Sequence, residues 1–429
     1  MNIDQHKSRS TSPVSVTVID CTLRDGEQAP GVWFTLEEKL ELARALSDAG
    51  VAVLDAGFPA SSPADLEAMQ EMRRMGISAR LAATARPVLS DVLAAERARA
   101  DEVFLFMPTS DLRLRETLGI TRERAGQIFR EGAEAVAARN MRLNLVFEDA
   151  TRAKASQLVQ MVETLRPHVP IERLVICDTV GCAHPTGMEQ LIRTLDMVFD
   201  GEIELCSHSH NDFGFAGANT VAAVLGGARA ITCTVNGIGE RAGNADLAEC
   251  VAALTHIHGI SHDIDARALP RLAQMVERMS GLHTSVTKPV TGFNVYRHES
   301  GVHVDGMLKD SRSYEFLPAA WVGRSSEYVL GKHSGTALIR HLLSQAGIEC
   351  DDALARELLK DVKDLTARRD KSEHRRAYSL KEAFARFELS GIDPAIVIAA
   401  ARQALEDGAE EEFMQVEFIN KVKGEWRAP

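Results

Sequence analysis

The stretch VTVIDCTLRDGE, residues 16–27, distinguishes between two parallel-sheet folds, the (β/α)8 barrel and the doubly wound sheet. Its first half is apolar and β-branched, as is typical of a strand buried on both faces. The run leads directly into Arg24, Asp25, Gly26 and Glu27. A doubly wound nucleotide-binding sheet has a glycine-rich phosphate turn at this point. The charged turn therefore favours a (β/α)8 barrel, in which catalytic groups follow the strands.

The sequence contains eight short apolar runs with the spacing of such a barrel. Segments between them carry apolar residues at helical intervals, as in Leu36–Ala49, Arg122–Asn140 and Ala153–Arg166, and Asn244–Ile257 is the expected eighth helix. Eight strand–helix units predict a closed (β/α)8 TIM barrel. The runs are Val16–Leu23, Val51–Gly57, Arg80–Thr84, Glu102–Pro108, Leu143–Glu148, Leu174–Thr179, Ile203–His208 and Ala230–Gly237.

The organisation of the chain is expected to have four parts. Residues 1–13 are polar and read as a disordered tail, and 14–282 form the catalytic barrel. Residues 283–335 are rich in Gly, His and Tyr with weak periodicity, and are expected to form a linker subdomain of loops and short helices that contributes to the active site. Helical spacing returns in 336–429, for example at 337–346, 352–367 and 393–405, which predicts a small helical appendage.

Composition narrows the class of protein. Apolar residues make up 45% and charged residues 26%, the balance of a soluble globular protein. A net charge of −12 argues against nucleic acid or an anionic membrane as the main partner. The seven cysteines are scattered, without a Cys-x-x-Cys spacing, and are expected to be reduced. Without an apolar leader or an 18-residue apolar span, the expected compartment is the cytoplasm.

Reactive side chains gather where the predicted strands end. Arg24 and Asp25 end the first run, Glu148 the fifth and Thr179 the sixth, and the motif HSHND at 208–212 ends the seventh. The eighth runs into NGIGERAGN at 236–244. Because the carboxyl ends of barrel strands meet on one face, these groups are predicted to converge there.

A divalent-metal site is predicted within that face. His208 and His210 are two residues apart on a strand, so their imidazoles point to the same side. With Asp25 they make a three-ligand site that leaves positions open for a substrate. The alternative is a pair of histidines hydrogen-bonded to each other. Asn244 is expected to add an oxygen ligand, to cap the following helix, or to do both.

Arg24 is a candidate for charge stabilisation rather than for base catalysis. Its guanidinium stays protonated, so it can stabilise an enolate or alkoxide oxygen but cannot accept a proton. The alternative is a structural salt bridge to Glu240 or to another strand-end acid. The cysteines at 177, 182 and 206 are interpreted as packing residues, because no base is paired with them.

Five motifs together resemble the DRE-TIM metallolyase superfamily, and more narrowly its Claisen-condensing branch of homocitrate, isopropylmalate and citramalate synthases. Superfamily lyases and carboxyltransferases share the first motifs but not the last two. The resemblance extends from about residue 16 to 335. The motifs are DCTLRDGEQ at 20–28, HSHNDFG at 208–214, NGIGERAGN at 236–244, HESGVHVDG at 298–306 and LGKHSG at 330–335.

The resemblance implies an acyltransferase that condenses acetyl-CoA with a 2-oxoacid and hydrolyses the thioester to give a 2-substituted malate. It implies a divalent cation (Mg, Mn, Co or Zn) on Asp25, His208 and His210, with Asn244 near or on the metal. Arg24 would contact the 2-oxo oxygen, and Thr179 and Glu148 would bind substrate. Glu240 and His298 would transfer protons, with His298 entering the site of a neighbouring subunit of a homodimer.

The second substrate was predicted from Asn144, in the middle of the fifth run. Homocitrate synthases of the lysine pathway carry an arginine there, and isopropylmalate synthases a glutamate, so this sequence follows neither. A neutral amide beside the distal end of the acceptor predicts a polar 2-oxoacid, homocitrate-like, helped by a cation such as Arg113, Arg115 or Arg152. Phosphonomethylmalate or phosphinomethylmalate, isopropylmalate and citramalate synthesis stay open as alternatives, as does an HMG-CoA lyase-type reaction.

Overall fold

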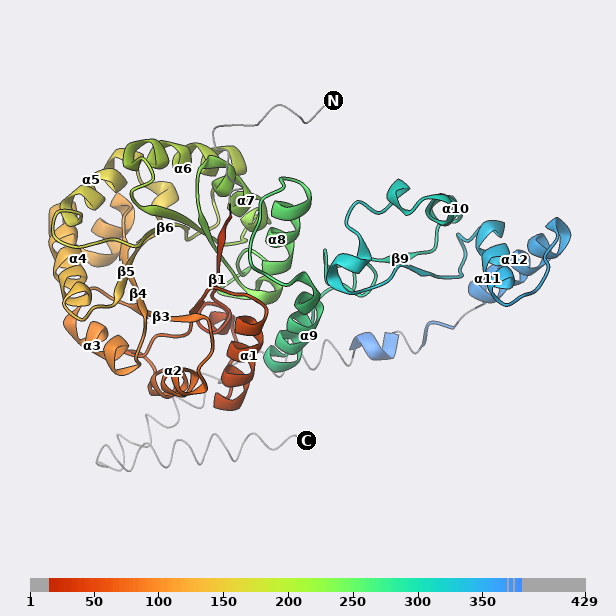
Figure 1. Cartoon of the computed structure of the whole chain (residues 1–429), viewed down its shortest axis with the longest axis horizontal. Coiled ribbons are helices and arrows are strands. Elements are labelled where there is room, and N and C mark those ends of the chain that lie inside the picture. Colours follow the sequence, from red (N-terminus) through yellow and green to blue (C-terminus); the bar gives the residue numbers. More distant parts are fainter. Residues whose placement is uncertain (1–14, 369, 373–374, 380–429) are drawn as a thin grey trace. The chain divides into compact units, whose positions relative to one another are not determined.

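The chain forms a closed parallel barrel of eight strands, each followed by a helix (Figure 1). The structure is a computed structural model that describes residues 15–368, 370–372 and 375–379. All eight predicted strands are confirmed. They are β1 (Thr17–Asp20), β2 (Val53–Asp55), β3 (Arg80–Ala85), β4 (Glu102–Pro108), β5 (Arg142–Glu148), β6 (Arg173–Asp178), β7 (Glu204–Ser209) and β8 (Ala230–Cys233).

Helices surround the strands on the outside of the barrel (Figure 1). Their starts follow from local sequence: Thr35 and Glu38 form a capping box before α1, and Pro63 and Pro185 occupy the first turns of α2 and α6. The helices are α1 (Leu36–Asp48), α2 (Pro63–Met75), α3 (Leu89–Arg97), α4 (Arg122–Ala137), α5 (Ala155–Leu165), α6 (Pro185–Phe199), α7 (Ala216–Gly226), α8 (Leu247–His256) and α9 (Leu269–Ser280).

The strand register arranges the barrel interior in rows. Asn144 of β5 is the partner of Phe104 in β4 and of Arg173 in β6, and Arg173 is the partner of Glu204 in β7. One pleat nearer to the carboxyl ends, Phe106, Val146, Val175 and Cys206 form the next row.

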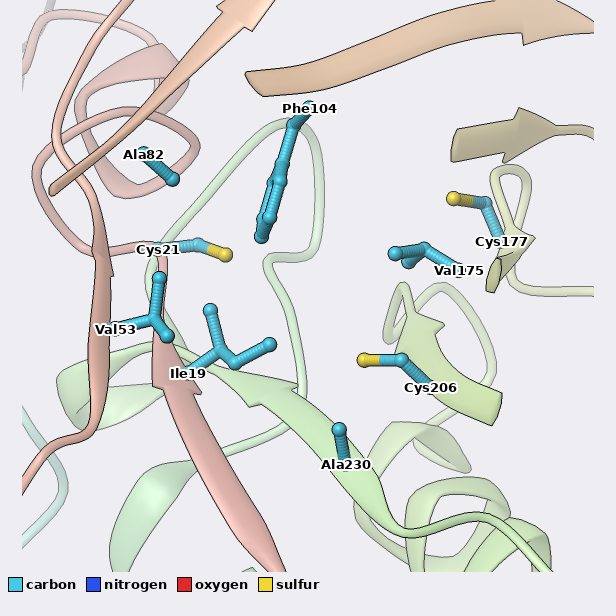
Figure 2. Packing of buried hydrophobic residues seen from close by; sticks show 9 residues of the cluster. All are labelled: Ile19, Cys21, Val53, Ala82, Phe104, Val175, Cys177, Cys206 and Ala230. Carbon is cyan, nitrogen blue, oxygen red and sulfur yellow. The ribbon is translucent and has the colours of Figure 1, made fainter. Parts of the chain in front are cut away.

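Apolar side chains from around the barrel converge in its interior. Figure 2 shows nine of them, among which Ile19, Phe104 and Val175 come from three different strands. Below them, toward the amino ends of the strands, Arg173 is buried against Glu102, Asn144 and Glu204. The barrel is therefore a packed core closed at one end by a buried ion network.

Beyond α9 the structure describes short elements, in agreement with the irregular pattern of the sequence. They are β9 (Arg297–His298), α10 (Gly301–Lys309), β10 (Glu327–Tyr328), α11 (Thr336–Gln345) and α12 (Asp352–Ala367). The helices predicted at 337–346 and 352–367 are confirmed. The chain divides into compact units of residues 1–370 and 371–429. The tail predicted at 1–13 and the helix at 393–405 lie outside the described residues.

Two further observations concern the cysteines and the helices of the described part of the chain. All seven cysteines are free, and five of them are buried. Among the described helices none is long and apolar enough to cross a membrane.

Candidate active site

A cavity of about 240 Å³ opens where the strands of the barrel end. Its lining includes Arg24 and Asp25 after β1, Glu148 at the end of β5 and Thr179 after β6. His208 and His210, at the end of β7, and Glu240, after β8, also line it. The sequence therefore predicted correctly that these side chains share one face.

Asp25, His208 and His210 form a compact group in this cavity. One ligand atom from each lies within 4.8 Å of the others, and all three residues are buried. The two Nε2 atoms of the histidines are 3.3 Å apart, and the Nε2 atom of His208 is 3.6 Å from a carboxylate oxygen of Asp25. Three donor atoms thus point at one small volume.

Hydrogen bonds around His208 fix which of its nitrogens carries the proton. The hydroxyl of Thr232 in β8 donates to the carbonyl oxygen of Ser207 at 3.1 Å. It must therefore accept from the Nδ1–H of His208, 2.8 Å away. With its proton on Nδ1, His208 turns the lone pair of Nε2 toward Asp25 and His210, as a metal ligand requires.

Burial keeps both imidazoles neutral. It lowers the pKa of His208 to about 3, with the carboxylate of Asp25 acting in the opposite direction. Burial also lowers the pKa of His210. For Asp25, burial alone would raise the pKa, but the positive charge of Arg24 and the hydrogen bond from Asn244 help to hold it below its usual range. All three groups are in the state that binds a cation.

The donor set fits a divalent cation. Two imidazoles and a carboxylate with open positions suit Zn, Mn, Co or related ions. The Nδ1 atom of His210 and the Oδ1 atom of Asn244 are buried without a hydrogen-bond partner among the described residues. Buried polar atoms rarely stay unpaired, and Asn244 lies against the group: its Nδ2 atom donates to Asp25 at 2.6 Å. The alternative role of Asn244 as a helix cap is wrong, because Asp246 caps α8.

Arg24 is held rigidly beside the cluster. Its Nε atom donates to Asp55 at the end of β2 over 2.7 Å, and Nη1 donates to Asp25 over 2.7 Å. Asp55 is fully buried and also accepts from Thr84 of β3. The expected salt bridge is therefore present, but to Asp25 and Asp55 rather than to Glu240. The Nη2 group is left for a ligand in the cavity, which Arg24 lines.

Three more polar residues line the cavity: Glu148 at the end of β5, Thr179 after β6 and Arg241 after β8. Burial raises the pKa of Glu148, while Arg113, 3.7 Å away, acts to lower it. The hydroxyl of Thr179 accepts from the backbone N–H of Asp149 at 2.8 Å, so its proton is free for a ligand oxygen. Arg241 donates to Asp212 and to the carbonyl oxygen of Thr179.

The chain matches two protein-family models. The family model described as HMGL-like matches residues 15–276, which is more than half of the sequence. The chain belongs to the HMGL-like family. A second family model, described as homocitrate synthase post-HMGL domain-like, matches residues 290–370. The resemblance to the DRE-TIM metallolyases and their Claisen-condensing branch is thereby confirmed, and the protein is an enzyme.

Curated relatives of this chain are named as citramalate and homocitrate synthases. A Methanopyrus kandleri protein named as an (R)-citramalate synthase is 41% identical over 82% of this chain and 69% of its own length. A homocitrate synthase of Methanothermobacter thermautotrophicus is 38% identical over 84% of this chain and 91% of its own. A homocitrate synthase of Sulfolobus acidocaldarius is 36% identical, covering 82% and 75%.

Solved structures share the fold. The HMG-CoA lyase of Pseudomonas aeruginosa matches with a TM-score of 0.57 and 21% identity, over 65% of this chain and 97% of that one. The carboxyl transferase domain of Rhizobium etli pyruvate carboxylase matches with a TM-score of 0.51 and 17% identity, over 63% of this chain and 47% of that one. At these identities the likeness concerns the barrel alone.

The role predicted for Asn144 in this HMGL-like enzyme is wrong. Its side chain does face the barrel interior, but one pleat below the cavity, which Val146 lines instead. The amide is fully engaged there. Its Oδ1 atom accepts from Arg173 at 2.9 Å, and Nδ2 donates to Glu102 at 3.1 Å. Asn144 therefore belongs to the ion network that closes the barrel.

His298 is not among the residues that line the cavity. It lies in β9, paired with β10, where its ring centroid is 6.3 Å from that of Tyr328. Its Nε2 atom is buried without a hydrogen-bond partner among the described residues. Within one HMGL-like chain, the described residues that line the cavity therefore do not include His298.

Several residues of the site were missed from the sequence. Asp55 lies near the end of the second run, and β2 ends at it, so it carried a usable signal as an acid near a strand end. Thr232 faces inward from β8, but nothing in the sequence indicates that it orients a histidine. The aromatic side chains of the wall, Phe58, Phe104 and Phe106, read as ordinary core residues.

Proposed function

We propose that this enzyme condenses acetyl-CoA with a 2-oxoacid and releases free CoA, giving a 2-substituted malate. The observation that carries the proposal is the buried group of Asp25, His208 and His210 with Arg24 held against it, in a chain whose relatives include citramalate and homocitrate synthases. The match of residues 290–370 to a homocitrate synthase domain favours synthesis over a lyase reaction.

The reaction balances without a redox step. The methyl carbon of acetyl-CoA loses a proton and forms a bond to the 2-oxo carbon, whose oxygen becomes a hydroxyl. Water then cleaves the thioester, which releases the CoA thiol and leaves a carboxylate. A divalent cation on Asp25, His208 and His210, with Asn244 beside it, would polarise the 2-oxo group when bound.

Arg24 has the geometry to stabilise negative charge on the former 2-oxo oxygen. Two of its donors are fixed by Asp25 and Asp55, so the free Nη2 group is positioned before the reaction begins. Thr179, whose hydroxyl proton is free, is proposed to bind the carboxylate of the acceptor. Glu148 is proposed to bind substrate at the rim.

Proton transfer is assigned to two residues. Glu240 lines the cavity, and it is proposed to act with His298 in making the enolate of acetyl-CoA. Because His298 does not line the cavity of its own chain, we propose that it serves the site of a partner in a homodimer. We also propose that the enzyme acts in the cytoplasm.

The homocitrate-like acceptor favoured by the sequence rested on Asn144. Because that residue lies below the cavity, it gives no support for a polar distal group, and the proposed function is stated for 2-oxoacids as a class.

The test is release of CoA thiol from acetyl-CoA in the presence of single 2-oxoacids, with Mn²⁺, Mg²⁺, Co²⁺ or Zn²⁺ added. We expect release that depends on both acceptor and metal, and that is lost in His208→Ala. Cleavage of 3-hydroxy-3-methylglutaryl-CoA without condensation would show a lyase instead.

A further inference from the structure

The cavity has two chemically different sides. The groups proposed to hold the reacting end of the acceptor come from two strands: Asp25 follows β1, His208 lies near the end of β7, and His210 follows β7. Phe104, Phe106, Val146 and Val175 line the cavity from β4, β5 and β6. Because the barrel closes in the order β1 to β8, strands β4 and β5 lie across it from β8 and β1. The metal-binding group and these apolar side chains therefore face each other, and Glu148 and Thr179 stand where β5 and β6 end.

The apolar side is a fixed wall. Phe106 and Phe58 meet edge to face, with ring centroids 5.9 Å apart. Phe106, Val146 and Val175 share one register row, so their side chains lie next to one another. Phe104 and Val175 are 3% and 2% exposed. Figure 2 shows that the ring of Phe104 extends into the interior, where the other buried side chains converge. Phe104 is thus the floor of this side.

Among the described residues that line the cavity, every arginine is paired. Arg24 and Arg241 are the basic residues other than histidine in the lining, and each is paired with carboxylates: Arg24 with Asp25 and Asp55, Arg241 with Asp212.

The arginines that the sequence offered as helpers are also engaged elsewhere. Arg113 lies 3.7 Å from Glu148, Arg115 pairs with Glu116 and Arg152 with Asp149, and none of the three lines the cavity. The lining adds the carboxylates of Glu148 and Glu240 instead. A second carboxylate on the acceptor would be desolvated here without an unpaired cation among the described residues as its partner.

We propose that the acceptor is a 2-oxoacid with an apolar side chain, and that Phe104 and Val146 set the length and width of that side chain. This rests on the proposed function, because it takes the 2-oxo group and the 1-carboxylate to be held on the polar side. The side chain of an acceptor held in this way points across the barrel, onto Phe106, Val146 and Val175, and ends at Phe104.

The test uses a matched pair of acceptors. 5-Methyl-2-oxohexanoate has an isopropyl group in place of the distal carboxylate of 2-oxoglutarate, at nearly the same size. With Mn²⁺-loaded full-length enzyme and saturating acetyl-CoA, we expect kcat/KM at least about 100-fold higher for the apolar acid. From pyruvate upward, each added methylene should raise kcat/KM by about fourfold until the chain reaches Phe104. Calorimetric titration of the same enzyme with each acid should show the same order of Kd.

Variants test the floor. Phe104→Leu should shift preference by about tenfold or more toward acceptors longer by one or two carbons, while KM for acetyl-CoA stays within about twofold. Phe147→Leu is the matched control. Phe147 is fully buried on the outward face of β5, with its ring 6.0 Å from that of Phe129 in α4, and it does not line the cavity. It should lower stability and leave the preference ratio unchanged.

The outcomes separate the two proposals. Preference for 2-oxoglutarate, oxaloacetate or phosphonopyruvate over every apolar acid would overturn the apolar acceptor and leave the condensation standing. An unchanged preference in Phe104→Leu would overturn the role of the floor. If none of these acceptors led to release of CoA, both the proposed function and the proposed acceptor class would be overturned.

Discussion

Thr232→Val is the most informative single change near the metal-binding group, because it alters one hydrogen bond and almost no volume. In the enzyme the hydroxyl of Thr232 accepts the Nδ1–H of His208 at 2.8 Å and donates to the carbonyl of Ser207. Valine removes both interactions. His208 is then free to place its proton on Nε2, which removes the lone pair that a cation needs.

The size of the effect follows from burial. Thr232 is 3% and His208 7% exposed, so water does not readily replace the lost acceptor. An unpaired buried donor costs about 1–3 kcal/mol, and loss of such an orienting partner weakens metal binding by about 10–100-fold. The two figures agree, because about 1.4 kcal/mol corresponds to a factor of ten in Kd.

The assay is titration of metal-free protein with Mn²⁺, Co²⁺ or Zn²⁺ by calorimetry, so it does not depend on turnover. Thr220→Val is the matched control, since Thr220 is a fully buried threonine of α7 whose hydroxyl has no hydrogen-bond partner among the described residues. We expect weaker binding in Thr232→Val alone. Equal Kd values for Thr232→Val and wild type, within about twofold, would refute the argument that Thr232 fixes the tautomer.

Three further changes test other parts of the account. Arg24→Lys should keep its metal and lose about 10²–10³-fold in kcat, because a compact ammonium lacks the planar fork that spans Asp25 and Asp55 while aiming a further donor at the ligand; a loss below about fivefold would make Arg24 a structural residue. Asn144→Leu should lower the free energy of unfolding in urea by about 1–3 kcal/mol without changing acceptor preference, and a changed preference would contradict its placement below the cavity. Glu148→Gln should raise thermal stability at pH 7, because burial raises the pKa of Glu148 and its ionised form opposes folding. The gain in unfolding free energy should be below about 1 kcal/mol, since the carboxyl is partly exposed. It should vanish below the unfolded pKa of 4.5, so a gain that persists at pH 3 would point to another cause.

The fold was predictable because its strands are buried on both faces. Runs such as the sixth stay apolar over successive positions, from Leu174 to Cys177, which distinguishes them from the helices between them and fixes their number. Strand number and alternation with helices then leave few topologies. The ends were less certain: the eighth run was expected to reach Gly237, but β8 ends at Cys233, where the chain turns over a kink at Asn236.

The metal-binding group was predictable for a similar reason. His208 and His210 share a strand face by the two-residue period, and strand β8, which pairs with both β7 and β1, brings the end of β1 close to them. The two-residue period also places Asn144 inside the barrel correctly. It carries no information about height along the strand, which depends on the stagger between strands, and here Asn144 falls one pleat too low.

Contacts between side chains from distant elements were beyond the sequence. The Asp55 carboxylate reaches Arg24 across 31 residues, and the Thr232 hydroxyl reaches His208 across 24. Each follows from packing of complete strands rather than from a local pattern. The apolar wall was hidden for another reason: Phe104 and Phe106 have the composition of core residues, and only the position of the cavity distinguishes them.

The most direct test of the central claim is the fate of the acetyl group. Enzyme loaded with Mn²⁺ is incubated with acetyl-CoA labelled with ¹³C in the acetyl carbons and with a mixture of pyruvate, 5-methyl-2-oxohexanoate and 2-oxoglutarate, and the products are identified by mass spectrometry. We predict one labelled 2-substituted malate for each CoA thiol released, formed from an acceptor with an apolar side chain and absent in His208→Ala. Labelled acetate as the sole product, or a labelled acyl-CoA that keeps its thioester, would contradict the account.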